Sequence, residues 1–316
     1  MISISMNWNS FVTDLVAGIV HGSVYALIAL GYSMVYGILK LLNFAHGDVY
    51  MVGSFIGYGV LTVFGGALAA SLPIALLLVL MFFAATLGGG VLGVVIERFA
   101  YRRLREAPRI APLITALGVS FFLENAAVLL LGSQFQSFNT YSWNNGSLWS
   151  IGFTLPAGYR VGLPQIIAVV GAIVLMLALT YFVNRTQTGR AMRATSYDRQ
   201  AAEMMGIDVN RVIAVTFFIG SALAGAAGVF NCIVYQNVWP YMGFDAGLKA
   251  FTAAVVGGIG NLPGAVVGGL AIGLAEAFTI GFLSSTFSDA IVFALLIAVM
   301  ILRPSGLLGR AAVQKV

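Results

Sequence analysis

Long apolar runs separated by short polar segments dominate the chain. They lie at residues 11–39, 49–65, 72–96, 112–132, 164–183, 212–235, 248–259, 262–283 and 289–302. A membrane-spanning helix needs roughly 20 mostly apolar residues, so the run at 248–259 is too short to cross unaided. The glycine-rich stretch 255–269 predicts a broken or re-entrant helix there, which is tolerated only inside protein or beside a water-filled cavity. The pattern predicts an all-α polytopic membrane protein with seven to nine transmembrane helices, including broken or re-entrant segments.

Composition supports this prediction. Hydrophobic residues make up 60% of the 316 residues and charged residues only 9%, and the mean hydropathy is +0.97. Soluble domains are roughly 45–50% apolar and about 25% charged, so this chain could not cover a soluble surface. The largest polar insert, residues 133–163, is too short to form an independent core. We therefore expect a single transmembrane domain over residues 1–316.

Arginine positions predict the orientation in the membrane. Arginines cluster at 97–109, at 184–211 and after residue 302, and the positive-inside rule places such segments in the cytoplasm. The segment 133–163 has one arginine and should be periplasmic. Residues 1–10 lack the basic start of a cleaved secretory signal, so the first run is expected to remain as a span. We expect a periplasmic N-terminus, a cytoplasmic C-terminus and an odd number of crossings, seven or nine; whether 248–259 crosses stays open.

The usual signatures of enzymes are missing from the sequence. No G-x-x-x-x-G-K-[ST] pattern occurs, which argues against ATP binding through a P-loop, and no H-E-x-x-H or G-x-S-x-G pattern occurs. The single Cys232 excludes an intrachain disulfide and a cysteine-cluster metal site. The net charge of +5 is first a topology signal in a membrane protein, not evidence of nucleic-acid binding.

Ionisable residues inside apolar runs are costly and usually functional. Glu124 lies in the middle of one run and Glu276 in another, and either is a candidate for the translocation path or for an interhelical hydrogen bond. A proton-coupled secondary carrier would need such carboxylates, so that function remains an alternative. The intramembrane ionisable residues are Asp14, His21, Glu124, Asp245, Lys249 and Glu276.

A polar knot, residues 43–48, separates the first two runs and contains one of the two histidines. No second histidine or cysteine neighbours His46 in sequence, which disfavours a catalytic or metal site. Asn43 and Asp48 can cap helix ends, and Gly47 permits a sharp bend. We interpret the knot as a broken-helix hinge near the cytoplasmic end of the first two spans, with His46 as a candidate for gating or lining a passage.

The loop at 184–211 contains a more specific motif. Within 197–212, "YDRQAAEMMGIDVNRV", the core Q-A-A-x-x-x-G resembles the E-A-A-x-x-x-G loop of ABC importer permeases, with glutamine at the position where glutamate is usual. Small alanines allow close approach, and a glycine can end the helix in a conformation that other residues resist. The alternative is a solvated basic loop. The candidate coupling residues are Arg193, Arg199, Gln200, Ala201, Ala202, Glu203 and Gly206.

Further segments match in order along nearly the whole chain. Residues 42–47 (LNFAHG), 189–207, 250–269 and 303–310 (RPSGLLGR) resemble the LivH type of branched-chain amino-acid permease. Urea and amide permeases share the same overall pattern, so these substrates remain alternatives.

The resemblance implies a division of labour. The chain would be the permease domain of an ABC importer for leucine, isoleucine and valine in the bacterial inner membrane, with no cofactor of its own. Its partners would be a second, LivM-like permease, two cytoplasmic ATPases that bind ATP and Mg, and a periplasmic binding protein that selects the substrate. A coupling helix at about 193–206 would dock on an ATPase. The hinges would be the knot and a second break at 257–264, which contains Gly257, Gly258, Gly260 and Gly264.

Overall fold

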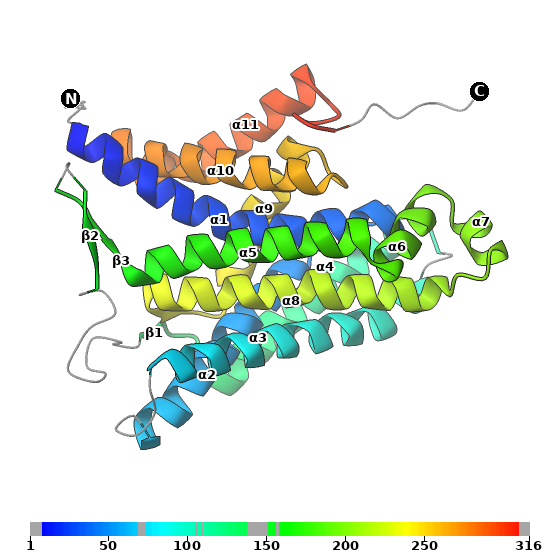
Figure 1. The fold of residues 1–316 in the computed structure, drawn as a ribbon, viewed down its shortest axis with the longest axis horizontal. Helices are drawn as coiled ribbons and strands as arrows, with labels where there is room; N and C mark the ends of the chain where they lie inside the picture. Colours follow the sequence, from blue (N-terminus) through cyan, green and yellow to red (C-terminus); the bar gives the residue numbers. More distant parts are fainter. Residues whose placement is uncertain are drawn as a thin grey trace.

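The computed structural model describes residues 8–68, 74–104, 107–108, 110–137, 151–155 and 158–309. Most long helices run along the longest axis of the molecule (Figure 1). The helices are α1 Trp8–Leu39, α2 His46–Leu68, α3 Ile74–Ile96, α4 Ile110–Leu131, α5 Leu163–Arg185, α6 Gln187–Tyr197, α7 Arg199–Met204, α8 Val209–Tyr235, α9 Met242–Gly257, α10 Leu262–Phe282 and α11 Ser288–Leu302. The shorter helical segments are a π-helix, η1 Glu97–Tyr101, and two 3-10 helices, η2 Arg102–Leu104 and η5 Ser285–Phe287.

Eight helices of the described chain are long and apolar enough to cross a membrane, which confirms the prediction of an all-α polytopic protein. The remaining candidate is α9, which has 16 residues and is about 24 Å long, shorter than a hydrocarbon core of roughly 30 Å. α9 nevertheless connects the end of α8 to the start of α10 at the opposite end of the bundle (Figure 1). It is therefore a ninth, shorter traverse.

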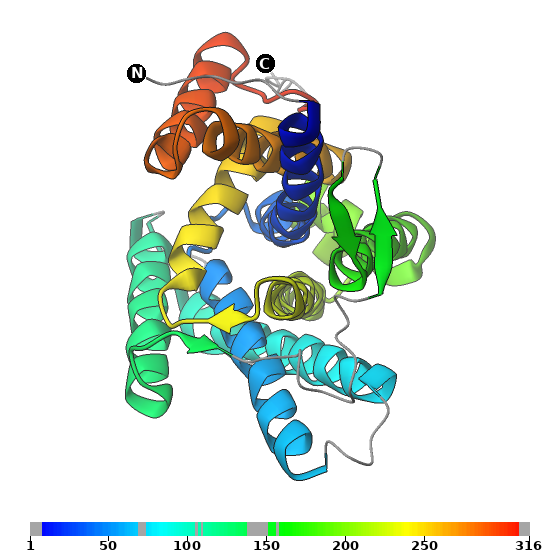
Figure 2. The same ribbon diagram turned by 90° about the vertical axis from the view of Figure 1, so that its left-hand side faces the viewer.

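α1 and α8 form the centre of the bundle, with the other helices around them (Figure 2). Of their apolar windows, 72% and 78% are buried, against 11% for α11 and 17% for α4. α10 packs closely along α1, because small residues line the contact: a Cβ at Gly22 would lie 2.8 Å from the backbone of Leu270. In lipid, where apolar contact alone gains little, such close backbone approach is what holds helices together.

The two ends of the bundle differ. At one end lie two small antiparallel pairs, β1 (Gln136–Ser137) with β4 (Asn237–Val238), and β2 (Gly152–Thr154) with β3 (Arg160–Gly162). Within the predicted outward segment, residues 138–150 and 156–157 lie outside the described residues. At the other end lie α6, α7 and the break between α9 and α10 (Figure 1).

The chain after α11 packs on this second end. The N–H of Leu307 donates to Val256 O at 2.8 Å, and the N–H of Leu308 donates to Gly257 O at 3.0 Å. These two carbonyls belong to the last turn of α9, which has no intrahelical donors for them. Residues 307 and 308 thus cap α9 from a distant part of the sequence.

Candidate functional site

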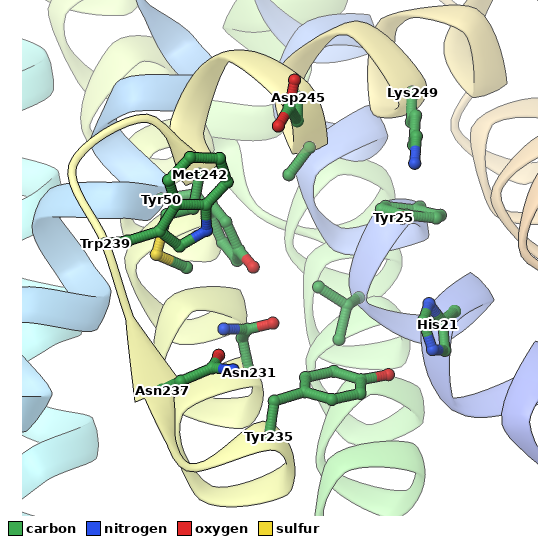
Figure 3. A pocket seen from close by; sticks show the side chains of 12 residues that line it. His21, Tyr25, Tyr50, Asn231, Tyr235, Asn237, Trp239, Met242, Asp245 and Lys249 are labelled. Carbon is green, nitrogen blue, oxygen red and sulfur yellow. The ribbon is translucent and has the colours of Figure 1, made fainter. Parts of the chain in front are cut away.

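A cavity of about 250 Å³ lies between α1, α2, α8 and α9. It is nearer the strand end of the bundle, because Tyr235 is the last residue of α8 and Asn237 belongs to β4. Figure 3 shows its polar wall, which combines neutral donors and acceptors with charged groups from α9. The labelled lining residues are His21 and Tyr25 of α1, Tyr50 of α2, Asn231 and Tyr235 of α8, Asn237 and Trp239 of the connection, and Met242, Asp245 and Lys249 of α9.

Glu276 of α10 lies behind this wall and is 4% exposed. Tyr25 Oη donates to Glu276 Oε2 at 2.7 Å, and Lys249 Nζ donates to Glu276 Oε1 at 2.6 Å. Ser288 Oγ donates to Oε1 at 3.4 Å, and His21 Nδ1 lies 3.7 Å from Oε2. The carboxylate therefore joins four helices, which satisfies a charge that a membrane interior would otherwise penalise heavily.

Lys249 connects this network to the start of α11. Its Nζ also lies 2.9 Å from Asp289 Oδ1, and its side chain is only 16% exposed. Lys249 and Asp245 are one helical turn apart and both line the cavity, so α9 presents opposite charges on one face.

The polar knot is buried beside a later part of α1 than the part that lines the cavity: His46 lies at Gly31 and Tyr32, whereas the cavity is lined by residues 21–25. Asn43, His46 and Asp48 are 2%, 1% and 0% exposed. His46 packs against Gly31 of α1 and stacks edge-on on Tyr32, with the ring centroids 4.8 Å apart. Gly31 is eight residues before the end of α1, or about 12 Å along the helix. The knot therefore lies at the start of α2, as expected, but about 12 Å short of the end of α1, because residues 40–45 turn back along α1 before α2 begins.

Aromatic rings pack against one another between the cavity and the end of α1. The centroid of the Phe251 ring lies 6.0 Å from that of Tyr32 and 5.7 Å from that of Phe44. Tyr50, which lines the cavity, is one turn beyond His46 on α2. These rings form an apolar layer between the cavity and the α6–α7 end of the bundle.

Asp48 lacks the partners that Glu276 has. Among the described residues, neither of its carboxylate oxygens accepts a hydrogen bond of ordinary geometry; the hydroxyl of Ser120 is a polar neighbour but is not aligned as a donor, and Glu124 of α4 is the neighbouring charge. Glu124 is 6% exposed and in turn faces Asp245. The structure thus brings three carboxylates, Asp48, Glu124 and Asp245, to the start of α9, where the helix dipole favours negative charge.

Glycines set both breaks. At the knot, a Cβ at Gly47 would overlap the backbone of Gly243 and Gly247, so α2 and α9 touch backbone to backbone. At the second break the backbones of Gly257 and Gly264 face each other equally closely. Gly258 has φ +110° and Gly260 has φ +87°, and a backbone at +110° is open only to glycine at little cost.

The coupling loop forms two helices where one was expected. Asp198 has φ −151°, which ends α6, and its Oδ1 accepts the N–H of Ala201 at 3.0 Å to begin α7. The expected single helix at about 193–206 is therefore wrong, because an N-cap aspartate divides it. After α7, Gly206 has φ +81° and the N–H of Ile207 donates to Ala202 O.

The exposure of the motif residues is uneven. Met204 and Met205 are 83% and 82% exposed, whereas Ala202 is 4% exposed and packs on its own chain. Arg193 donates to Val183 O, and Arg199 lies 3.3 Å from Glu203. Met204 and Met205 therefore add an apolar part to the exposed surface at the end of α7, next to the exposed ion pair that Arg199 and Glu203 form within the helix. The exposed residues of the predicted set are Arg193, Arg199, Gln200, Ala201, Glu203 and Gly206.

The sequence marked His21, Asp245 and Lys249 as ionisable residues inside apolar runs without assigning them to the path, and it did not reveal the neutral wall of the cavity. Tyr25, Asn231 and Tyr235 lie within apolar runs and have no motif of their own. A polar residue such as Asn231 inside such a run is a weak signal, because interhelical hydrogen bonds explain it equally well. The spacing of His21 and Tyr25, four residues apart on one helix face, was the available clue.

Residues 15–300 match the family described as branched-chain amino acid transport system / permease component. The chain belongs to this permease family. It is 43% identical to the high-affinity branched-chain amino acid transport system permease protein BraD of Pseudomonas aeruginosa, over 97% of this chain and 98% of that protein. It is 42% identical to the corresponding protein LivH of Escherichia coli K12, with the same coverage.

A more distant relative is the ribose import permease protein RbsC of Haemophilus influenzae. It is 28% identical over 79% of this chain and 72% of its own length. The resemblance of this permease to the LivH type, predicted from motif order, is confirmed by the near-complete coverage of BraD and LivH.

Proposed function

We propose that this chain is the transmembrane permease subunit of an ABC importer that takes up branched-chain amino acids, driven by ATP hydrolysis on partner subunits. The observation that carries the proposal is the 42–43% identity, over 97% of the chain, to two permeases named for branched-chain amino acid transport. The whole chain would act as one permease domain. Urea or short amides are the alternative substrates, and no named relative favours them.

The orientation follows from the charges at the two ends of the bundle. Arg185, Arg190, Arg193 and Arg199 lie at the α6–α7 end, whereas the strand end carries Arg160. Cytoplasmic loops are enriched in arginine and lysine. Residues 184–211 would therefore be the cytoplasmic coupling loop, and residues 133–163 the periplasmic segment. The N-terminus would be periplasmic and the C-terminus cytoplasmic, in the inner membrane of a bacterium.

The α6–α7 surface is suited to an ATPase partner. Met204 and Met205 project into solvent, and methionine adapts well to apolar grooves on a partner. Two cytoplasmic subunits that bind ATP and Mg would receive this surface. A second, LivM-like permease and a periplasmic amino-acid-binding protein would complete the importer.

The arrangement supports alternating access. The cavity lies on the proposed periplasmic side, and the ring layer of Tyr32, Phe44 and Phe251 separates it from the cytoplasmic side. Movement of α6 and α7 would turn α9 and α2 on their breaks and part this layer. The proposed path and hinge residues are Asn43, His46, Gly47, Asp48, Glu124, Gly257, Gly258, Gly260, Gly264 and Glu276.

The test is leucine uptake by the reconstituted complex, with Gly206→Ala as the variant. Alanine at φ +81° is strained by roughly 1–2 kcal/mol, which should distort the end of α7. We expect ATP hydrolysis to continue while leucine import per ATP falls severalfold. Gly158→Ala is the matched control, because Gly158 has φ +78° at the opposite end of the bundle and has nothing within 4 Å of an added Cβ.

Three results would contradict the proposal. Normal coupling in Gly206→Ala with the ATPases assembled would remove the coupling role of α7. Uptake by this chain alone in liposomes under a pH gradient would make it a secondary carrier. Import of urea or acetamide in place of leucine would change the substrate class.

A further inference from the structure

The two opposite charges on the cavity face of α9 do not pair with each other. Asp245 and Lys249 are four residues apart, a spacing at which such residues are neighbours on a helix and often form an ion pair. Here Lys249 Nζ lies 2.6 Å from Glu276 and 2.9 Å from Asp289. Within the described chain, Asp245 takes part in no ion pair. The network behind the wall thus holds the lysine away from the aspartate.

Lys249 retains capacity toward the cavity. An ammonium group has three donors, and Glu276 and Asp289 occupy two of them. Lys249 lines the cavity, and Figure 3 shows its amine directed toward Tyr25, another lining residue, with Asp245 one turn away on the same helix. The cavity therefore presents a carboxylate that forms no ion pair with the described residues, and a positively charged donor about one helical turn from it.

We propose that this cavity is itself an amino-acid-binding site, in which Asp245 binds the α-ammonium group and Lys249 binds the α-carboxylate of a zwitterion. This inference rests on the proposed function and assigns its substrate to particular atoms. A zwitterion would form one ion pair with Asp245 and a second with Lys249. Asn231 and Tyr235 supply neutral hydrogen bonds, and Val24, Met242 and Trp239 provide an apolar wall for a branched side chain.

Such a site discriminates by charge. An analogue that lacks one of the two groups leaves Asp245 or Lys249 desolvated without a partner, and a site built for a polar group rejects ligands that lack it. Uncharged urea and short amides satisfy neither charge. The permease would thus bind zwitterions selectively, in a step after a binding protein has released the substrate.

The first test measures binding of radiolabelled leucine to the full permease–ATPase complex in nanodiscs, without the binding protein. The wild-type complex should bind leucine, and valine and isoleucine should compete. Isocaproate, which lacks the ammonium group, and isoamylamine, which lacks the carboxylate, should compete at least about tenfold more weakly. Because this comparison uses the wild-type protein, it does not depend on the folding of any variant.

The second test is Asp245→Asn in the same complex. The dissociation constant for leucine should rise about tenfold or more, and the preference for leucine over isocaproate should shrink. Asp14→Asn makes the same chemical change at another carboxylate of the strand end, one that does not line the cavity, and should leave leucine binding unchanged.

Unchanged leucine affinity in Asp245→Asn would overturn the inference, as would equal competition by isocaproate and leucine, or the absence of leucine binding to the wild-type complex. The proposed function fails separately: it would be wrong if the wild-type complex, supplied with its binding protein and ATP, did not import leucine. A complex that imports leucine but binds it equally well after Asp245→Asn refutes the site alone.

Discussion

Two regions of this permease bury a carboxylate, and they treat it in opposite ways. Glu276 is hydrogen-bonded to Tyr25, Lys249 and Ser288 from three other helices. Asp48 is fully buried, yet in the described chain neither of its oxygens has a hydrogen-bond partner. Buried polar groups are nearly always satisfied, and exceptions call for an explanation. In the first region the carboxylate is fully hydrogen-bonded and links four helices. In the second region, where α2 and α9 begin, the carboxylate lacks hydrogen bonds from the described residues.

The difference indicates where the molecule is rigid and where it is arranged to move. A paired network such as that of Glu276 fixes α1, α9, α10 and α11 relative to one another. Buried polar groups without hydrogen bonds occur mainly at functional sites. In the knot, such a group, Asp48, lies where the backbones of α2 and α9 are in direct contact. We therefore assign the first region to holding the cavity and the second to the moving layer beneath it.

The largest expected effect comes from removing the lysine of the paired region. Lys249→Met leaves the Glu276 carboxylate buried without its cation, which should lower the free energy of unfolding by about 3–5 kcal/mol. Thermal unfolding of the detergent-solubilised complex measures the loss. Adding Glu276→Leu should recover much of it, because two matched apolar residues replace an orphaned charge. Wild-type stability in Lys249→Met would show that the network is not a crosslink.

A smaller effect is expected from filling the close contact in the knot. Gly47→Ala places a methyl group on the backbone of Gly243 and Gly247, and such overpacking costs about 1–3 kcal/mol. The matched control is Gly59→Ala on the same helix, where nothing lies within 4 Å and alanine should be neutral or stabilising by up to about 1 kcal/mol. Equal melting temperatures for the two variants would mean that α2 and α9 do not approach as described.

The smallest effect on stability should be at Asp48. Asp48→Asn removes a charge to which no described residue donates a hydrogen bond, so stability should stay within about 1 kcal/mol of wild type or rise. Glu276→Gln, the same chemical change, should cost about 2–3 kcal/mol because charged hydrogen bonds are lost. Leucine uptake should nevertheless fall in Asp48→Asn. If Asp48→Asn lowered stability as much as Glu276→Gln does, Asp48 would be stabilised by its surroundings as strongly as Glu276, and the proposed difference between the two regions would be wrong.

The spans were predictable because their cause is local. The expected runs at 164–183 and 212–235 correspond to α5, Leu163–Arg185, and α8, Val209–Tyr235. A bilayer imposes a length and an apolar composition on each span, and both can be read without knowing any neighbour. The break after residue 257 could also be predicted from the sequence, because clustered glycines readily adopt backbone conformations that end a helix.

Other features were beyond local reasoning. The Tyr25–Glu276 bond joins residues 251 positions apart, and no periodicity reveals such a partner. The division of the coupling helix at Asp198 had a local signal, an N-cap aspartate, which the resemblance to a single coupling helix obscured. The depth of the knot depended on how residues 40–45 turn back beside α1, where Tyr101 donates to Leu42 O and Asn43 Oδ1 and Phe251 of α9 packs on Phe44.

The sequence by itself determined that this protein lies in a membrane, where the long apolar helices are, which charges lie within apolar runs and which permease family the chain resembles. These properties follow from solvent transfer and from motif order, both of which act along the chain. Only the tertiary structure decided which charges meet. It gave Glu276 hydrogen bonds from three helices and Asp48 none from the described residues, and it paired Lys249 with Glu276 and Asp289 instead of Asp245, because pairing inside a bundle depends on how helices remote in sequence cross.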